Sequence, residues 1–493
     1  MTVSLAILGI VFAVAIALGL LAKRGHTMTL EQWSVGGRGF GSIFVFLLMA
    51  GEIYTTFTFL GGSGWAYNRG APALYILCYL TLAYSLSYFL LPAIWRYSQG
   101  RRLVSQADFF ISKYESPALG MLVSLVGVAA LVPYLVLQLK GLGIIVSEAS
   151  YGAISPTAAI WSGTAALIGY VVVSGVRGSA WTAALKDVMI LVIVVAMGIY
   201  LPLHYYGGYG AMFEAIDHAK PGLLTLPAAG MSQSWFISTV LLTSVGVYTW
   251  PQFFAGVYTA RGENVFRKNA VVLPLYQLVV LFVFFTGFAA SLVVPGLTGP
   301  DADLSLFRVA KLAFAPWAVG LIGGAGLLTA LVPGSMLLIT AATILGKNVF
   351  GAIVPSSSEH TIGFVARAMV PVLALFALYL TLQGGQAIVM LLLMGYNVVT
   401  QLFPALVLSF GQKPRISATA ALSGILAGEL TVAAITLSGV TIARLAPSLP
   451  QVIKDLNIGI VALAVNCTVI ALVTLATRRP APELQRSATG STA

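Results

Sequence analysis

Charge is scarce in this chain of 493 residues. Charged side chains make up 8% of it, against about 25% in soluble proteins, and apolar residues make up 59%. A soluble surface needs roughly 25–35% charged residues to stay dispersed, so a soluble enzyme, a coiled coil and a disordered chain are excluded. The composition predicts an all-α polytopic membrane protein that has the lipid bilayer as its surroundings.

Cysteine and histidine are also rare. The two cysteines, Cys78 and Cys467, lie in apolar runs, and the four histidines show no metal-binding spacing. The glycine-rich segment 61–64 lacks the Lys-Ser/Thr pair of a phosphate loop and the surroundings of a nucleophile elbow. We therefore expect no enzyme activity, no metal and no cofactor. The net charge of +11 is assigned to loops rather than to a nucleic-acid partner.

Apolar runs of about 20 residues, the length that crosses a bilayer, predict about thirteen transmembrane helices. The predicted spans are 4–22, 40–66, 72–96, 117–147, 155–176, 179–204, 234–256, 270–296, 312–345, 361–383, 385–410, 416–441 and 455–477. We expect one transmembrane domain over 1–479 and a disordered cytoplasmic tail over 480–493. The longest external loop, about 205–233, is expected to carry a short amphipathic helix around Met212–His218.

The distribution of basic residues orients the predicted bundle. With Met1 outside, 17 of the 26 cations fall in inside loops, six fall outside and three lie in spans or at their ends. Cytoplasmic loops carry the excess of Lys and Arg, so the N-terminus is predicted outside and the C-terminus inside a bacterial-type plasma membrane.

Two spans carry helix interrupters at their centres. The second span, 40–66, contains Gly51 and the glycines of 61–64, and the seventh, 234–256, contains Gly246 and Pro251. Glycine weakens a helix and proline removes one of its hydrogen bonds. Paired interrupted helices five spans apart are typical of inverted-repeat transporters, although glycines also serve simple close packing. The repeats would cover about 40–204 and 234–410, with peripheral helices at 4–22, 416–441 and 455–477.

Three stretches of the sequence resemble the sodium:solute symporter family. They are GEIYTTFTFLGGSGWAY in the second span, VRGSAWT at 176–182, and FFAGVYTARGENVFRKNA at 253–270. The second-span stretch and LVPGSMLLITAATILGKNVF at 331–350 look most like the monocarboxylate permease branch, which takes up lactate, pyruvate and related short acids. The resemblance implies a LeuT-type fold of two inverted five-helix repeats, and a small organic anion as substrate.

The sequence departs from that family where sodium should bind. The family's second sodium site combines carbonyl groups from the second-span break with two adjacent hydroxyl residues of the ninth span. Those two positions fall on Val332 and Pro333, which have no side-chain oxygen, so the site is predicted to be degenerate. Ser335, about one turn further on, is the nearest substitute. These departures favour a proton over sodium as the coupling ion.

Glu52 is the leading candidate for ion coupling. It lies mid-membrane beside the second-span break, where an ionisable residue is functional by default and burial favours its neutral, protonated form. A structural hydrogen bond to a neighbouring helix is the alternative. The roles of Glu429, Lys186 and Asp187 are left open, with a structural partner favoured for Glu429 and interface snorkelling or an ion pair for the other two.

Several polar and aromatic side chains are candidates for binding the substrate. Gln138 and Lys140 belong to the fourth span and point in different directions, so only one should face the cavity, and Lys140 is also placed to snorkel. The remaining candidates flank the two breaks: Tyr54, Thr55, Thr56, Gly61, Gly62 and Ser63 in the second span, and Tyr248, Trp250, Gln252 and Phe253 in the seventh. Packing or interface anchoring is the alternative for the aromatic residues.

These patterns predict a secondary active importer for a small monocarboxylate, taken up with a proton. A sodium-coupled symporter of another small organic solute and a channel are the alternatives. A monomer is the simplest expectation for the assembly.

Overall fold

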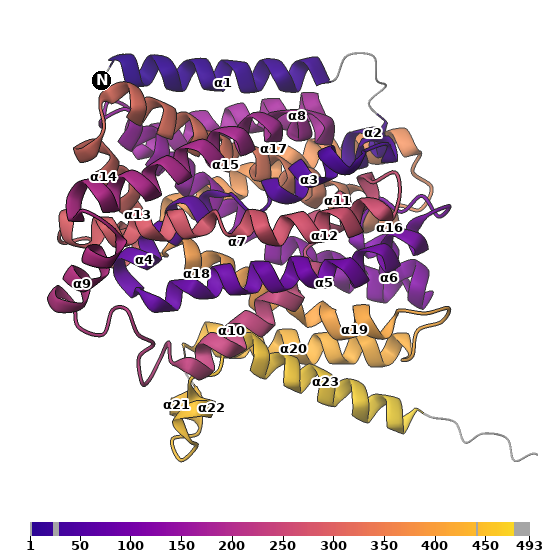
Figure 1. The fold of residues 1–493 in the computed structure, drawn as a ribbon. Helices are drawn as coiled ribbons and strands as arrows, with labels where there is room; N and C mark the ends of the chain where they lie inside the picture. Colours follow the sequence, from indigo (N-terminus) through magenta and orange to yellow (C-terminus); the bar gives the residue numbers. More distant parts are fainter. Residues whose placement is uncertain (1, 23–28, 440–441, 478–493) are drawn as a thin grey trace, which may run out of the picture.

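The chain folds almost entirely into helices that run along one common direction (Figure 1). The structure is a computed structural model and describes residues 2–22, 29–439 and 442–477. The predicted tail, 480–493, lies outside the described residues. Within them, ten helices are long and apolar enough to cross a membrane. The predicted total of thirteen is reached by adding the two interrupted spans and by counting the two halves of one long helix, Pro156–Tyr206, separately. That total stays a prediction.

The helices follow one another with short connections. In chain order the main elements are α1 Thr2–Ala22, α2 Leu30–Val35, α3 Ser42–Gly51, η2 Phe57–Gly62, α4 Ser63–Arg69, α5 Tyr75–Ser98, α6 Gln106–Tyr114, α7 Pro117–Ala149, α8 Pro156–Tyr206, α9 Tyr209–Ala219, α10 Gln233–Gly246, η4 Val247–Thr249, α11 Pro251–Thr259, α12 Asn264–Gln277, α13 Val280–Val293, η5 Gly299–Leu304, α14 Ser305–Ala313, α15 Pro316–Thr343, η6 Ile344–Phe350, α17 Glu359–Gln383, α18 Ile388–Val399, α19 Phe403–Leu408, α20 Ala418–Ser438 and α23 Ile458–Ala476.

Helix α8 is two helices joined by a reversal of the chain. Gly175 has φ +58°, and the hydroxyl groups of Tyr170 and Thr182 lie 2.8 Å apart. A straight helix would separate residues 12 positions apart by about 18 Å. The chain therefore turns back at Gly175, as the separate spans 155–176 and 179–204 predict.

Helix α15 lies at the centre of the bundle. It is buried along its whole apolar stretch and packs against α1, α7, α8 and α17. Glycines allow this close approach: a Cβ on Gly320 would come within 2.9 Å of the Ser4 backbone in α1, and one on Gly326 within 2.9 Å of Phe59. The length of the predicted span 312–345 is explained by α14, which precedes α15 as a separate short helix.

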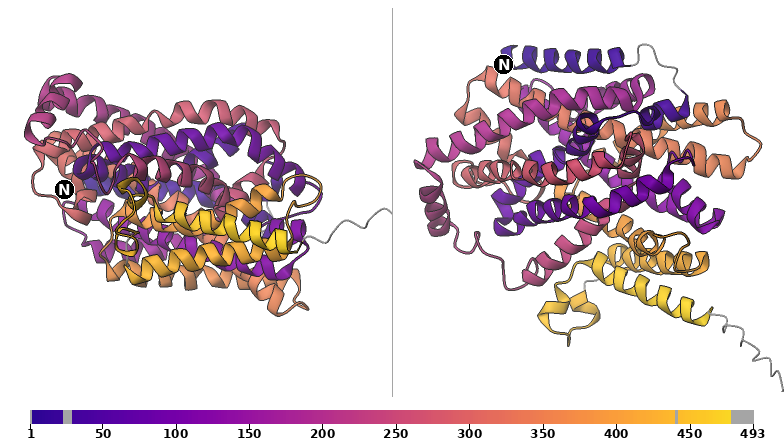
Figure 2. Two further views of the ribbon diagram at one scale, coloured as in Figure 1. Left: turned by 90° about the horizontal axis from the view of Figure 1, so that it is seen from below. Right: turned by 45° about the vertical axis from the view of Figure 1, so that its right-hand side comes forward.

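The first and the last described helices lie on opposite faces of the bundle. Helix α1 covers one face and the α20–α23 pair covers the other (Figures 1 and 2). The external loop predicted at 205–233 contains α9, whose Met212 and Ile216 are buried, so the predicted amphipathic helix is confirmed.

Candidate functional site

The first break separates α3 from η2 and α4. Helix α3 ends at Gly51, and the chain resumes a helical course at Phe57. Within the gap, Thr55 N–H donates to Ile53 O at 3.1 Å, and the Thr58 hydroxyl donates to Ile53 O at 2.7 Å. These short local bonds replace the regular helical pattern. Carbonyl groups of the gap are thereby left to accept hydrogen bonds from other helices.

The second break separates α10 from α11. Trp250 is extended, with ψ 128°, because it precedes Pro251 and the proline ring disfavours the helical conformation at that position. Pro251 then begins α11, where its missing N–H costs no helical hydrogen bond. The proline therefore starts a second half-helix rather than kinking a continuous one.

Backbone hydrogen bonds join the two interrupted spans at one end of the bundle. Phe40 N–H, just before α3, donates to Thr259 O at 2.9 Å, and Arg261 N–H donates to Phe40 O at 3.0 Å. The start of one broken helix is thus tied to the end of the other. The two breaks are held side by side between the same neighbours.

Glu52 and Gln252 connect the two breaks. The Gln252 amide donates to Glu52 Oε2 over 3.4 Å, a long and therefore weak hydrogen bond. Glu52 is half-buried, and Gln252 is buried with its Oε1 unpaired among the described residues. The predicted coupling residue therefore faces the second broken helix, and its partner is a neutral amide.

Gln138 lies against the first break. The Thr56 hydroxyl donates to Gln138 Oε1 at 2.7 Å, and a Cβ on Gly141 would touch Thr56, so α7 passes close to the gap. Gln138 is 1% exposed, and its Nε2 has no hydrogen-bond partner among the described residues. A buried, unpaired donor costs about 1–3 kcal/mol, so this amide is poised to donate to a ligand.

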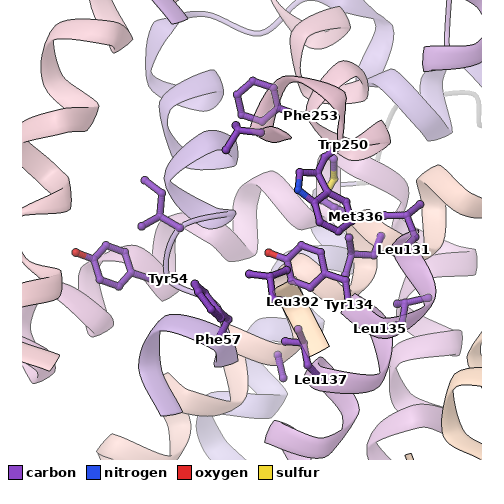
Figure 3. Packing of buried hydrophobic residues seen from close by; sticks show 14 of the residues in the cluster. Tyr54, Phe57, Leu131, Tyr134, Leu135, Leu137, Trp250, Phe253, Met336 and Leu392 are labelled. Atoms are coloured by element: carbon purple, nitrogen blue, oxygen red, sulfur yellow. The ribbon is translucent and has the colours of Figure 1, made fainter. Parts of the chain in front are cut away.

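Aromatic and aliphatic side chains gather around Tyr134, which lies one turn before Gln138 on α7. The rings of Tyr134 and Trp250 lie 5.3 Å apart, edge to face, and Trp250 meets Tyr396 at the same spacing. Figure 3 shows Tyr134 and Trp250 gathered with Met336 and Leu392, while the Tyr54 ring points away from them. These side chains form a buried, mainly apolar cluster beside α7 and the second break.

Three predicted ligands are engaged elsewhere. The Tyr54 hydroxyl donates to Tyr276 O at 3.0 Å, and the Tyr248 hydroxyl donates to the backbone of Ala83. Lys140 Nζ donates to Asp303 Oδ2 and to Gln386 O, both at 2.8 Å. Lys140 therefore pairs with η5 and the start of α18, while Gln138 contacts the break.

The remaining candidates serve the packing around the breaks. Phe253 stacks at an angle against Tyr84 and Tyr248. The Thr55 hydroxyl accepts from Phe57 N–H at 3.1 Å within the gap. A Cβ on Gly61 would lie 3.0 Å from Ile388, and one on Gly62 3.4 Å from Phe284, whereas the Ser63 hydroxyl lies 3.4 Å from that of Ser305. These three positions pack against α18, α13 and α14 and do not face the gap.

The ninth-span residues present hydrocarbon to the first break. A Cβ on Gly51 would lie 3.7 Å from Val332 Cγ1, so Val332 faces the gap. Pro333 follows it inside α15 and is also without a polar side-chain atom. The Ser335 hydroxyl donates to Val332 O at 2.6 Å and lies 2.6 Å from the Ser179 hydroxyl. It is thus engaged with α8 and with its own helix.

Lys186 lies at the first break, a place that reasoning from the sequence did not give it. Its side chain is fully buried, so of the two roles expected for it the interface snorkelling is wrong, and the ion pair with Asp187 is confirmed. Nζ donates to Gly51 O at 2.8 Å and to Tyr54 O at 3.0 Å, across the first break, and lies 3.2 Å from Asp187 Oδ1. Lys186 lies 11 residues after the reversal at Gly175. A helix rises about 16 Å over 11 residues, about half the thickness of the bilayer core, so counting from Gly175 would have placed Lys186 mid-membrane.

Comparison with known proteins adds three findings to this geometry. The sodium:solute symporter family matches residues 33–428 of the chain. The uncharacterized symporter YhjB of Bacillus subtilis (strain 168) is 59% identical over 479 residues, which cover 97% of this chain and 98% of that relative. The monocarboxylate transport permease protein of Rhizobium johnstonii is 28% identical over 404 residues, covering 78% and 80% of the two chains.

A solved structure resembles the whole bundle. It is a Na⁺-coupled sialic acid symporter in a substrate-bound, outward-open state, with a TM-score of 0.76, 17% sequence identity, and coverage of 95% of this chain and 97% of that one. That symporter has a LeuT-type fold, so the predicted fold class is confirmed. At this identity the likeness concerns the fold and leaves the solute and the coupling ion of this chain open.

Proposed function

Because the chain belongs to the sodium:solute symporter family, we propose that it imports a small monocarboxylate, such as lactate or pyruvate, across the bacterial plasma membrane by alternating access. It is a transporter and not an enzyme, and its substrate is a small solute. The name of the Rhizobium relative supports a monocarboxylate. The proposed orientation has the N-terminus outside, because of the excess of basic residues in the loops that would then be inside.

The observation that carries this proposal is the unpaired Gln138 amide. Its Nε2 is a buried neutral donor beside the first break, with Tyr134 one turn away on α7. One such donor can hold one carboxylate oxygen, and the neighbouring aromatic side chains can cover a short apolar body. A neutral donor also suits an acid that crosses together with a proton, because the pair is electrically neutral overall.

A second candidate function is sodium-coupled symport of another small organic solute. It is favoured by the coupling ion named for the sialic acid symporter, whose fold this chain shares. Against it stand Val332 and Pro333, because neither offers an oxygen where the family places two hydroxyl groups. We therefore propose a proton as the coupling ion, carried by Glu52.

Counterflow exchange tests the substrate without assuming a coupling ion. Proteoliposomes loaded with unlabelled lactate or pyruvate should take up the labelled acid, and sialic acid or proline should not compete. Gln138→Leu should lower kcat/KM about 10- to 100-fold, since a hydrogen bond to a charged group contributes about 1.5–3 kcal/mol. Gln383→Leu, which changes an exposed glutamine at the end of α17, is the control and should exchange normally. Absence of exchange with every short monocarboxylate would refute the substrate class.

A further inference from the structure

The gap between α3 and η2 frees backbone carbonyl groups that Lys186 then occupies. A continuous helix would direct Thr55 N–H to Gly51 O, but in the gap it donates to Ile53 O. Gly51 O accepts instead from Lys186 Nζ at 2.8 Å, and Tyr54 O accepts from the same nitrogen at 3.0 Å. Unpaired carbonyl groups are costly within a membrane, so the ammonium satisfies a need that the break creates.

The ammonium has three oxygen atoms close to it. An ammonium group offers three N–H donors. Two are used by the carbonyl groups of Gly51 and Tyr54, and Asp187 Oδ1 lies 3.2 Å from Nζ as an ion pair, without a hydrogen bond of its own among the described residues. Lys186 is 0% exposed and Asp187 is 5% exposed, so both charges are removed from water and depend on each other.

The same oxygen set is one that a small metal cation would accept. Hard cations take backbone carbonyl and carboxylate oxygens at short range. On the α15 side the pocket is closed by hydrocarbon: a Cβ on Gly51 would lie 3.6 Å from Lys186 Nζ and 3.7 Å from Val332 Cγ1. The cation that fills this pocket is therefore part of the protein, and helix α8 supplies it.

We propose that Lys186 is a built-in cation, which occupies an alkali-cation site made by Gly51 O, Tyr54 O and Asp187. The wild-type protein then binds no sodium at the break, and removal of the ammonium opens a site for a sodium ion. A tethered cation cannot cross the membrane, so this site contributes no gradient energy and coupling depends on another ion. Only the statement about coupling rests on the proposed function, because the cation site itself can be tested without measuring transport.

The test compares thermal unfolding in sodium chloride and in choline chloride at equal ionic strength. The Tm of the wild-type protein should be the same in the two salts. Lys186→Ala should have a lower Tm in choline chloride, because Asp187 and two carbonyl groups lose their partner. Sodium chloride should then raise the Tm of this variant by about 3 °C or more, since a ligand that binds only the folded state stabilises it.

Two further variants make the result specific. Lys268→Ala removes an exposed lysine of α12 and should behave as wild type in both salts. Lys186→Ala combined with Asp187→Asn should lose the sodium effect, because the negative ligand is gone. The proposal is overturned if sodium stabilises the wild type as much as Lys186→Ala, or if folded Lys186→Ala is indifferent to sodium.

A binding measurement on the wild type covers the case in which Lys186→Ala cannot be purified. Radioactive sodium should show no saturable binding to the wild-type protein in detergent, and saturable binding would refute the built-in cation. Failure of lactate and pyruvate exchange would count against the proposed substrate and would leave these sodium measurements unaffected.

Discussion

Buried ionisable side chains divide into two kinds at the first break. Lys186 donates two hydrogen bonds to carbonyl groups and forms an ion pair with Asp187. Glu52, the residue next to Gly51, has one long hydrogen bond to a neutral amide and remains half-buried. A group with weak partners and partial access to water can exchange a proton during transport, whereas a fully paired group is suited to holding helices together. The contrast supports the proposals that Glu52 carries the coupling proton and that Lys186 occupies the cation position.

Glu52→Gln should separate exchange from accumulation. The amide keeps the shape of the side chain but cannot carry a proton, so counterflow exchange of the labelled acid should persist. Proton-driven accumulation should fall to the equilibrium distribution, an inside-to-outside ratio of about 1. Uptake into proteoliposomes with an imposed pH gradient measures this ratio.

The matched control for that variant is Glu429→Gln. Glu429 also lies within a membrane helix, α20, but outside the two repeats, and should tolerate the change. Accumulation by Glu52→Gln at the wild-type ratio would remove Glu52 from the coupling mechanism.

At the scale of single helices, chain breaks depend on a few glycines and prolines. Gly175 has φ +58° and ψ −163°, a conformation that essentially only glycine adopts and that costs another residue about 1–3 kcal/mol, and a Cβ there would lie 2.8 Å from Trp33 O. Gly175→Ala should therefore lower the Tm by several degrees and reduce the folded yield. Thermal unfolding followed by size-exclusion chromatography measures both effects.

Gly169→Ala is the control for that substitution. It lies in the same helix, with no atom within 4 Å of an added Cβ, so its stability should be unchanged or slightly increased. Equal stability of the two variants would contradict the reversal of α8 at Gly175.

Sequence patterns predicted the breaks because their cause is local. Pro251 forces Trp250 into an extended conformation whatever surrounds it, and the glycines of the second span weaken the helix in the same direct way. The position of Lys186 at the first break could not be predicted from nearby residues, because Lys186 and Gly51 lie 135 positions apart in the sequence. Placing the start of its span too close to Lys186 made the residue look interfacial. The sequence predicts that a side-chain ligand is lost at Val332. The ammonium group at the first break belongs to Lys186, which lies on a different helix, α8.

For the molecule as a whole, the fold and the coupling ion are separate questions. The bundle shares its fold with a Na⁺-coupled symporter at 17% identity, yet its first break holds an ammonium group. The α1 and α23 helices lie on opposite faces of the bundle (Figure 2). The shared fold therefore leaves open which ion drives transport in this chain, and that question falls to the buried residues at the breaks.

Uptake under separately imposed gradients tests the central claim most directly. Wild-type proteoliposomes would receive labelled lactate or pyruvate with an inward proton gradient, an inward sodium gradient, or neither. The account predicts accumulation with the proton gradient alone, and no additional uptake when sodium is present. Accumulation that requires the sodium gradient, and ignores the proton gradient, would contradict it.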